Sequence, residues 1–159
     1  MKKNFKELRI PSVNERLTEV EQFIEEICDV YYITNTYYGN ILLAITEAVK
    51  NAIVHGNRNN PGKFVNIQFN SVPNGLCFTI SDEGKGFNYQ DIPNPIETEN
   101  PSTIGTGIFL TRTLADKVTY NAKGNSVEIT FLISSIHYET TLSRITLLSH
   151  YFNKQKHLA

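Results

Sequence analysis

The sequence is poor in the residues that mark several protein classes. It has no tryptophan and only two cysteines, Cys28 and Cys77, and one separated pair provides neither a disulfide framework nor metal-ligand spacing. Lys and Arg number 15 against 16 for Asp and Glu, so no net basic field attracts nucleic acid or an anionic membrane. No apolar run approaches the ~18 residues of a membrane span, and no signal-peptide core follows the N-terminus. We therefore expect a cytoplasmic protein that binds neither nucleic acid nor membranes.

What remains is the composition of an ordinary globular domain. The 159 residues are 40% hydrophobic and 19% charged, which is near the globular average. We expect residues 1–133 to form one domain, because the patterned elements described next all lie there. Residues 134–159 are a C-terminal extension with a weak helical pattern and a basic end, and either a docked helix or a loose tail is compatible with them.

The spacing of apolar residues predicts a short strand around residues 8–10, followed by helices at residues 13–27 and 35–55. Alternation with period two then predicts one hairpin at residues 65–80 and a second at 118–133, separated by a helix that runs to Leu114. Each element has one apolar side that another element must cover. The order therefore predicts an α+β two-layer sandwich, with helices on one face of a mixed, mostly antiparallel sheet.

The first polar motif lies at the end of the second predicted helix. Glu47, Asn51 and His55 are four residues apart and would form one stripe on the side opposite the apolar face. A carboxylate that accepts a proton and an amide oxygen that binds Mg²⁺ would then face the same cleft. A solvated helix face is the alternative interpretation.

The second motif follows the first hairpin directly. Alternation places Asp82 on the apolar face of its strand, where an unpaired carboxylate would cost several kcal/mol and the amino group of an adenine could pair with it. Gly84 and Gly86 would let the backbone turn sharply and approach a flat base. An ordinary Gly-rich turn after a strand would give the same residues.

The third motif comes after a polar stretch at residues 88–104 that is longer than an idle loop. This stretch is expected to be either a functional lid or disordered. Gly105 and Gly107 then open the helix that runs to Leu114, and free N–H groups at a helix start, together with the helix dipole, suit a phosphate. Taken alone, two glycines at this spacing are weak evidence.

In this order, residues 47–57, 82–86 and 105–107 resemble the N, G1 and G2 boxes of the histidine-kinase-like ATPase superfamily. Within it, residues 8–133 are most similar to the small stand-alone serine kinases that act as bacterial anti-sigma factors. The resemblance implies ATP and Mg²⁺ as cofactors. It also implies that Glu47 polarises the attacking hydroxyl or water, that Asn51 holds Mg²⁺, and that Asp82 binds adenine.

The resemblance implies roles for five more residues. Gly84 and Gly86 would shape the base pocket, and Gly105 and Gly107 would contact phosphates beneath a mobile lid. Thr130, on the last predicted strand, would line the base pocket.

The function implied by the resemblance is that of a serine/threonine protein kinase acting as an anti-sigma factor. Its substrate would be an anti-anti-sigma protein, a sigma factor would be a second candidate partner, and the family suggests a homodimer. The main alternative is a non-catalytic switch module that binds ATP and a protein partner but transfers no phosphate. A hydrolase or an unrelated binding domain remains a further alternative.

Overall fold

The computed structural model describes residues 5–100, 102–133 and 138–158. The described strands are β1 (Phe5–Pro11), β2 (Phe64–Val72), β3 (Gly75–Ser81), β4 (Lys117–Tyr120) and β5 (Ser126–Leu132). The described α-helices are α1 (Leu17–Val30), α2 (Asn35–Asn51), α3 (Thr103–Leu114) and α4 (Tyr138–Leu158). The strands form one sheet in the order β1-β2-β3-β5-β4.

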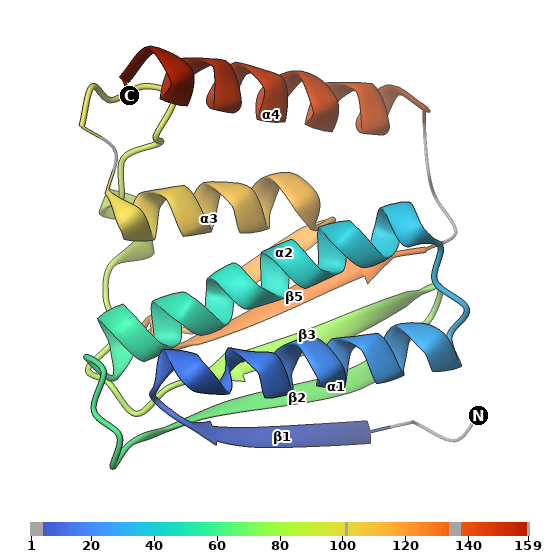
Figure 1. Ribbon diagram of the computed structural model, residues 1–159, viewed down its shortest axis with the longest axis vertical. Helices are drawn as coiled ribbons and strands as arrows, with labels where there is room; N and C mark the ends of the chain where they lie inside the picture. The colour runs from blue at the N-terminus through green and yellow to red at the C-terminus, as the bar shows by residue number, and fades with distance from the viewer. Residues whose placement is uncertain (1–4, 101, 134–137, 159) are drawn as a thin grey trace.

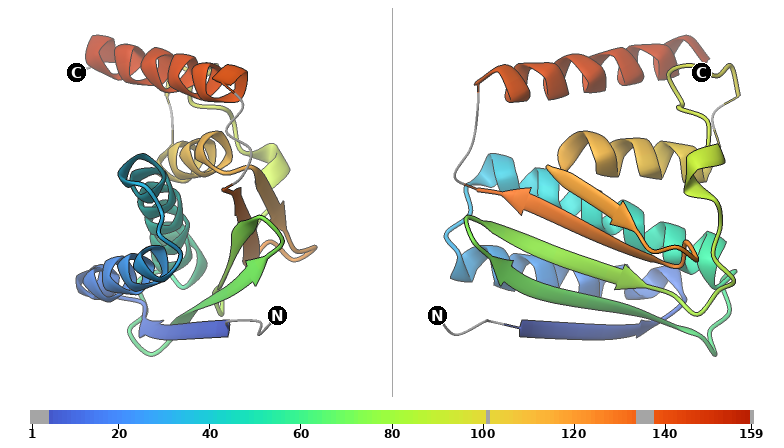
Figure 2. Two further views of the ribbon diagram at one scale, coloured as in Figure 1. Left: turned by 90° about the vertical axis from the view of Figure 1, so that its right-hand side faces the viewer. Right: turned by 180° about the vertical axis from the view of Figure 1, so that it is seen from behind.

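The expected α+β sandwich is confirmed (Figures 1 and 2). Helices α1, α2 and α3 lie side by side on one face of the sheet, and α4 packs beyond α3. The sheet was expected to be mostly antiparallel with some parallel pairing, and every pairing between the described strands is antiparallel. β1 and β2 are antiparallel because α1 and α2 run in opposite directions. The chain therefore returns to the end of the sheet where β1 stops, and β2 starts there.

The core lies between this sheet and α1 and α2. Phe69, Phe78 and Phe131 come from the three central strands and are almost fully buried. Their rings form a continuous row, with centroids 5.3 Å apart between Phe69 and Phe78 and 6.2 Å apart between Phe78 and Phe131. Contacts at these separations add to the stabilisation that burial provides. The central strands are thereby fixed in register beneath the helices.

The described part of the C-terminal extension is a docked helix. The Tyr151 ring lies 5.4 Å from the Phe109 ring of α3, and both side chains are buried. Arg144 forms a 2.6 Å ion pair with Asp116, which follows α3. None of the described helices has both the length and the apolar character needed to cross a membrane.

A buried asparagine joins three segments at one end of the sheet. The Asn57 amide nitrogen donates to Ser12 Oγ (2.7 Å) and to the Phe64 carbonyl (2.9 Å), and its amide oxygen accepts from the Glu83 N–H (2.8 Å). Asn57 is only 1% exposed. These bonds fix the end of β1, the start of β2 and the loop after β3 relative to α2.

Replacing Asn57 with alanine is expected to lower the free energy of unfolding by about 2–4 kcal/mol, because several hydrogen bonds are lost and buried polar partners are left unpaired. Urea unfolding followed by circular dichroism measures this loss. The matched control is Asn100→Ala, since Asn100 is exposed. Equal stability of the two variants would contradict the anchoring role of Asn57.

Candidate functional site

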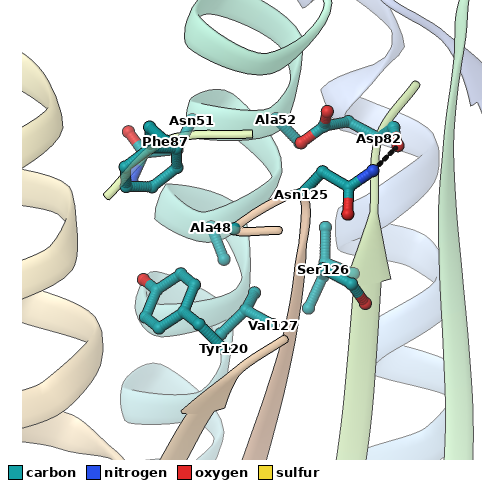
Figure 3. A pocket seen from close by; sticks show the side chains of 11 residues that line it. Ala48, Asn51, Ala52, Asp82, Phe87, Tyr120, Asn125, Ser126 and Val127 are labelled. Atoms are coloured by element: carbon teal, nitrogen blue, oxygen red, sulfur yellow. Dashed lines mark hydrogen bonds between the residues drawn. The ribbon is translucent and has the colours of Figure 1, made fainter. Parts of the chain in front are cut away.

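A pocket opens at the end of the sheet where α2 stops, between that helix and the ends of β3 and β5 (Figure 3). It lies on the helix-covered side of the sheet. Its lining residues are Ala48, Asn51, Ala52, Ile80, Asp82, Phe87, Tyr120, Gly124, Asn125, Ser126 and Val127. Two of the residues expected from sequence, Asn51 and Asp82, therefore meet in one pocket although they come from different elements.

Asp82 supplies the carboxylate of this pocket. It directly follows β3, and its side chain points toward Ala52 of α2 (Figure 3). Its Oδ1 atom accepts a 2.7 Å hydrogen bond from the Gly84 N–H. Burial raises the pKa of the Asp82 carboxyl, while the Gly84 hydrogen bond and the charge of Lys123 oppose the rise. The ionised side chain is thus under-solvated, and a further hydrogen-bond donor would stabilise it.

The loop after β3 fits closely against its neighbours at two glycines. A Cβ atom on Gly84 would lie 2.2 Å from the Gly56 carbonyl oxygen. Gly86 has a φ of +78°, and a Cβ there would lie 1.8 Å from the Lys123 carbonyl oxygen. Both positions therefore require glycine. The loop crosses the end of α2 on one side and the β4–β5 turn on the other, and so forms one rim of the pocket.

Asn51 is the last residue of α2 and faces α3. A Cβ atom on Gly107 would lie 2.8 Å from the Asn51 amide nitrogen, so the absence of a side chain there lets α3 pack directly against this amide. The structure thus brings the first and third motifs together. The sequence analysis did not predict this contact between Gly107 and Asn51.

Glu47 lies one helical turn before Asn51 and does not line the pocket. Its carboxylate is 3.3 Å from the Lys50 ammonium group, and its side chain is 17% exposed. The expected stripe from Glu47 to His55 is interrupted, because α2 widens into a π-turn (η2) at Ala52–Gly56. The Asn57 N–H bonds to the Ala52 carbonyl, five residues back. His55 is left exposed and outside the pocket lining.

The expectation of free N–H groups at Gly105 is wrong in this structure. Helix α3 begins at Thr103, with Ser102 as its N-cap, and Ser102 Oγ accepts a 3.0 Å hydrogen bond from the Gly105 N–H. The Thr106 N–H bonds to the Ser102 carbonyl at 3.0 Å. The cap occupies these donors because a serine before a helix satisfies the first turn more readily than solvent does. A phosphate at Gly105 would have to displace it.

Thr130 does not line the pocket, and its expected place there is wrong. It pairs with Cys77 and Lys117 on the sheet face turned away from the helices, while Ile129 and Phe131 on either side of it are buried beneath them. Strict alternation along β5 explains this, since residue 130 must face opposite to its neighbours. The same alternation could have been read from the sequence.

The residues that sequence reasoning missed come mainly from the β4–β5 hairpin and from Phe87, just before the lid. Asn125 accepts a 3.0 Å hydrogen bond from the Asp82 N–H through its carbonyl and lies beside the pocket. From the sequence, Asn125 is typical of a turn. Its place beside Asp82 depends on the pairing of β3 with β5, which are far apart in sequence and leave no local pattern.

Phe87 and Tyr120 form an aromatic wall of the pocket, with ring centroids 6.1 Å apart. Burial raises the pKa of the Tyr120 phenol to about 12, so this group stays neutral at ordinary pH. The space open to the centre of a water molecule is only about 20 Å³, which is roughly enough for one water.

Comparisons with known proteins agree with this arrangement. A model of the histidine kinase-like ATPase domain matches residues 10–131, which include every residue of the pocket. The chain is 26% identical over 155 residues to the serine-protein kinase RsbW of Staphylococcus aureus strains MSSA476 and Newman. These alignments cover 92% of this chain and 98% of the relatives.

Two solved structures share the fold. The RsbU and RsbW domains of Rv1364c from Mycobacterium tuberculosis match with a TM-score of 0.54 and 15% identity, over 80% of this chain and 32% of that chain. The blue-light activated histidine kinase of Erythrobacter litoralis EL346 matches with a TM-score of 0.50 and 22% identity, over 79% and 42%. This chain thus spans less than half of either structure. Asn51 and Asp82 of the first two motifs line one pocket, and Gly107 of the third packs against Asn51. Because the family model covers most of its length, the chain belongs to the histidine kinase-like ATPase domain family.

Proposed function

We propose that this chain is an ATP-dependent protein-serine kinase that acts as an anti-sigma factor by phosphorylating an anti-anti-sigma partner. The observation that carries the proposal is the meeting of the Asp82 carboxylate and the Asn51 amide at one pocket. Similarity to the RsbW serine-protein kinases over almost the full chain supports the kinase assignment. Cytoplasmic location and homodimer formation are further parts of this proposal.

Asp82 is the group that would select adenine. An ionised carboxylate only accepts hydrogen bonds, and the exocyclic amino group of adenine donates them. Guanine presents a carbonyl oxygen at the corresponding position and would be repelled. Since burial already disfavours the bare carboxylate, pairing with the amino group would be worth more here than at an exposed aspartate.

The residues at the end of α2 fit a magnesium ion that also binds phosphates. No cluster of three or more His, Cys, Asp or Glu side chains that could hold a metal occurs in the described part of the chain. Mg²⁺ is commonly held by one or two protein oxygens together with water and substrate phosphates, and the Asn51 amide oxygen provides such a ligand. When bound, the ion would neutralise charge that develops on the transferred phosphoryl group.

Glu47 is the candidate base for the partner's serine. Its carboxylate would accept the proton of the attacking hydroxyl and orient that oxygen toward the γ-phosphate. Because Glu47 lies one helical turn before Asn51, which contacts Gly107 of α3, the serine would approach along this side of α2.

A non-catalytic switch remains the second candidate. The capped start of α3 favours it, because the Gly105 N–H is already bonded to Ser102 and the phosphate site is not preformed. Both candidates require ATP at Asp82. They differ in whether Glu47 contributes to phosphoryl transfer.

Replacing Asp82 with asparagine is expected to weaken Mg-ATP binding by roughly 10- to 100-fold, the typical cost of losing a hydrogen bond to a charged group. Calorimetric titration measures the change, with Asp29→Asn on the exposed surface of α1 as the matched control. Mg-GTP should bind the wild-type chain weakly. Equal ATP affinity in wild type and Asp82→Asn would contradict the adenine assignment.

The same Asp82→Asn variant is expected to melt at a higher temperature than wild type at pH 7 in the absence of nucleotide. The raised pKa means that the folded state is penalised when Asp82 is ionised. As the pH falls through the folded-state pKa, wild-type Asp82 takes up a proton and the penalty disappears. The melting temperatures of wild type and Asp82→Asn should therefore converge as the pH falls from 7 to 3. A difference between them that does not change with pH would contradict this cause.

Replacing Glu47 with glutamine is expected to lower the rate of phosphate transfer from ATP to an anti-anti-sigma protein by about 10²- to 10⁴-fold, the usual contribution of a general base. ATP affinity should change little. Radiolabelled phosphate transfer measures the rate, and Glu128→Gln on the exposed face of β5 is the matched control. Transfer at the wild-type rate would remove Glu47 from the catalytic assignment, and absence of transfer by the wild type would favour the switch.

A further inference from the structure

The middle of the lid, residues 88–104, rests on α4, whereas its start stays beside the pocket wall, where Tyr89 stacks on Tyr120 at 4.3 Å. Among its described residues, 88–100 and 102–104, none lines that pocket. Its middle part, residues 95–98, is held by the C-terminal half of α4. The helices lie in the order α1, α2, α3 and α4 (Figure 1), so this part of the lid is separated by α3 from the helix that carries Asn51.

Lys154 of α4 makes the polar part of this contact. Its ammonium group donates to the carbonyl oxygens of Pro95 (3.0 Å) and Ile96 (2.7 Å), and also to that of Thr98. A lysine ammonium has three donors and no acceptor, so these three carbonyls satisfy it completely. No ion pair of Lys154 is found within the described part of the chain. The lysine is thus committed to the lid backbone and to no acidic side chain.

Ile96 makes the apolar part. It packs against a small second core formed by Phe109 and Leu110 of α3 and by Tyr151 of α4. The adjacent Pro95 is also buried. The lid backbone next to Ile96 is shaped by a turn in which the Asn94 side chain accepts from the Ile96 N–H at 3.0 Å. One lid segment therefore contributes both carbonyls and a hydrophobic side chain to α4.

The base of the lid is also occupied in this arrangement. A Cβ atom on Gly105 would lie 3.0 Å from the Pro93 carbonyl and 2.9 Å from Ser102 Oγ. The lid backbone and the helix cap thus stand at the place where the glycine motif would meet a phosphate. For the lid to cover a nucleotide, residues 93–98 would have to leave Gly105 and Lys154 together.

We propose that Lys154 is a positioning residue that latches the lid on α4 and so opposes its closure over the nucleotide. The consequence for ATP rests on the kinase or switch function proposed above, whereas the latch itself does not. Because latched and closed lids exclude each other, the latch lowers the apparent ATP affinity by the fraction of molecules it holds open. By reciprocity, bound ATP must weaken the contact of α4 with the lid by the same factor.

The test compares the full chain carrying Lys154→Met with one carrying Lys156→Met. Both changes remove one positive charge from α4 and keep an unbranched side chain, but Lys156 is exposed and makes no polar contact with the described lid residues. Amide hydrogen exchange of peptides covering residues 92–100 reports the latch without nucleotide. Calorimetric titration with Mg-ATP reports its effect on binding.

The expected result is that Lys154→Met speeds exchange in residues 92–100 and tightens ATP binding by about fivefold or more, as a typical coupling between two sites. The Lys156→Met variant should match wild type in both measurements. In the wild type, added Mg-ATP should speed exchange in α4.

Two results would overturn the latch: unchanged lid exchange in Lys154→Met, or faster exchange accompanied by weaker ATP binding, which would make Lys154 a support of the closed lid. If lid exchange rises in Lys154→Met but neither variant nor wild type binds ATP, the latch stands and the proposed nucleotide function fails. The exchange and binding measurements therefore separate the two proposals.

Discussion

Close contact between two backbone segments determines where the pocket forms. The Gly84 backbone crosses the Gly56 carbonyl at a distance that leaves no room for a side chain, and Asn57 bonds to the Glu83 N–H beside this crossing. Together these contacts fix the end of α2 against the end of β3. Asn51 and Asp82 are adjacent to the two sides of that junction, so their meeting in one pocket is a consequence of it.

The two sides of the pocket differ in how firmly they are held. The side made by α2, β3 and β5 is anchored by buried hydrogen bonds and by the aromatic row of the central strands. The start of α3 and the lid, where phosphates would bind in the proposed function, are held by the Ser102 cap and by the hydrogen bonds of Lys154. This difference fits the proposed kinase, in which a partner would approach the γ-phosphate.

The sequence was informative where the signal is local. Alternation in β2 and β3 predicted their hairpin, and the position of Asp82 at the end of β3 followed from the same period. The π-turn at Ala52–Gly56 was not predictable from local periodicity, and it is followed by Asn57, whose side chain bonds to residues distant in sequence. The error at Thr130 had another origin. The family resemblance suggested a place in the pocket, whereas the alternation along β5 indicates the sheet face turned away from the helices.

The C-terminal extension shows what sequence patterns leave out. α4 has a weak helical pattern in the sequence, yet among its described side chains Arg144, Tyr151 and Lys154 contact the body of the protein.

The account as a whole depends on adenine binding at Asp82 beside Asn51. A crystal structure of the chain with Mg²⁺ and a non-hydrolysable ATP analogue tests this most directly. We predict that the adenine amino group lies within hydrogen-bonding distance of the Asp82 carboxylate and that the Asn51 amide oxygen binds the metal. A nucleotide bound elsewhere, or with its amino group turned away from Asp82, would contradict the account.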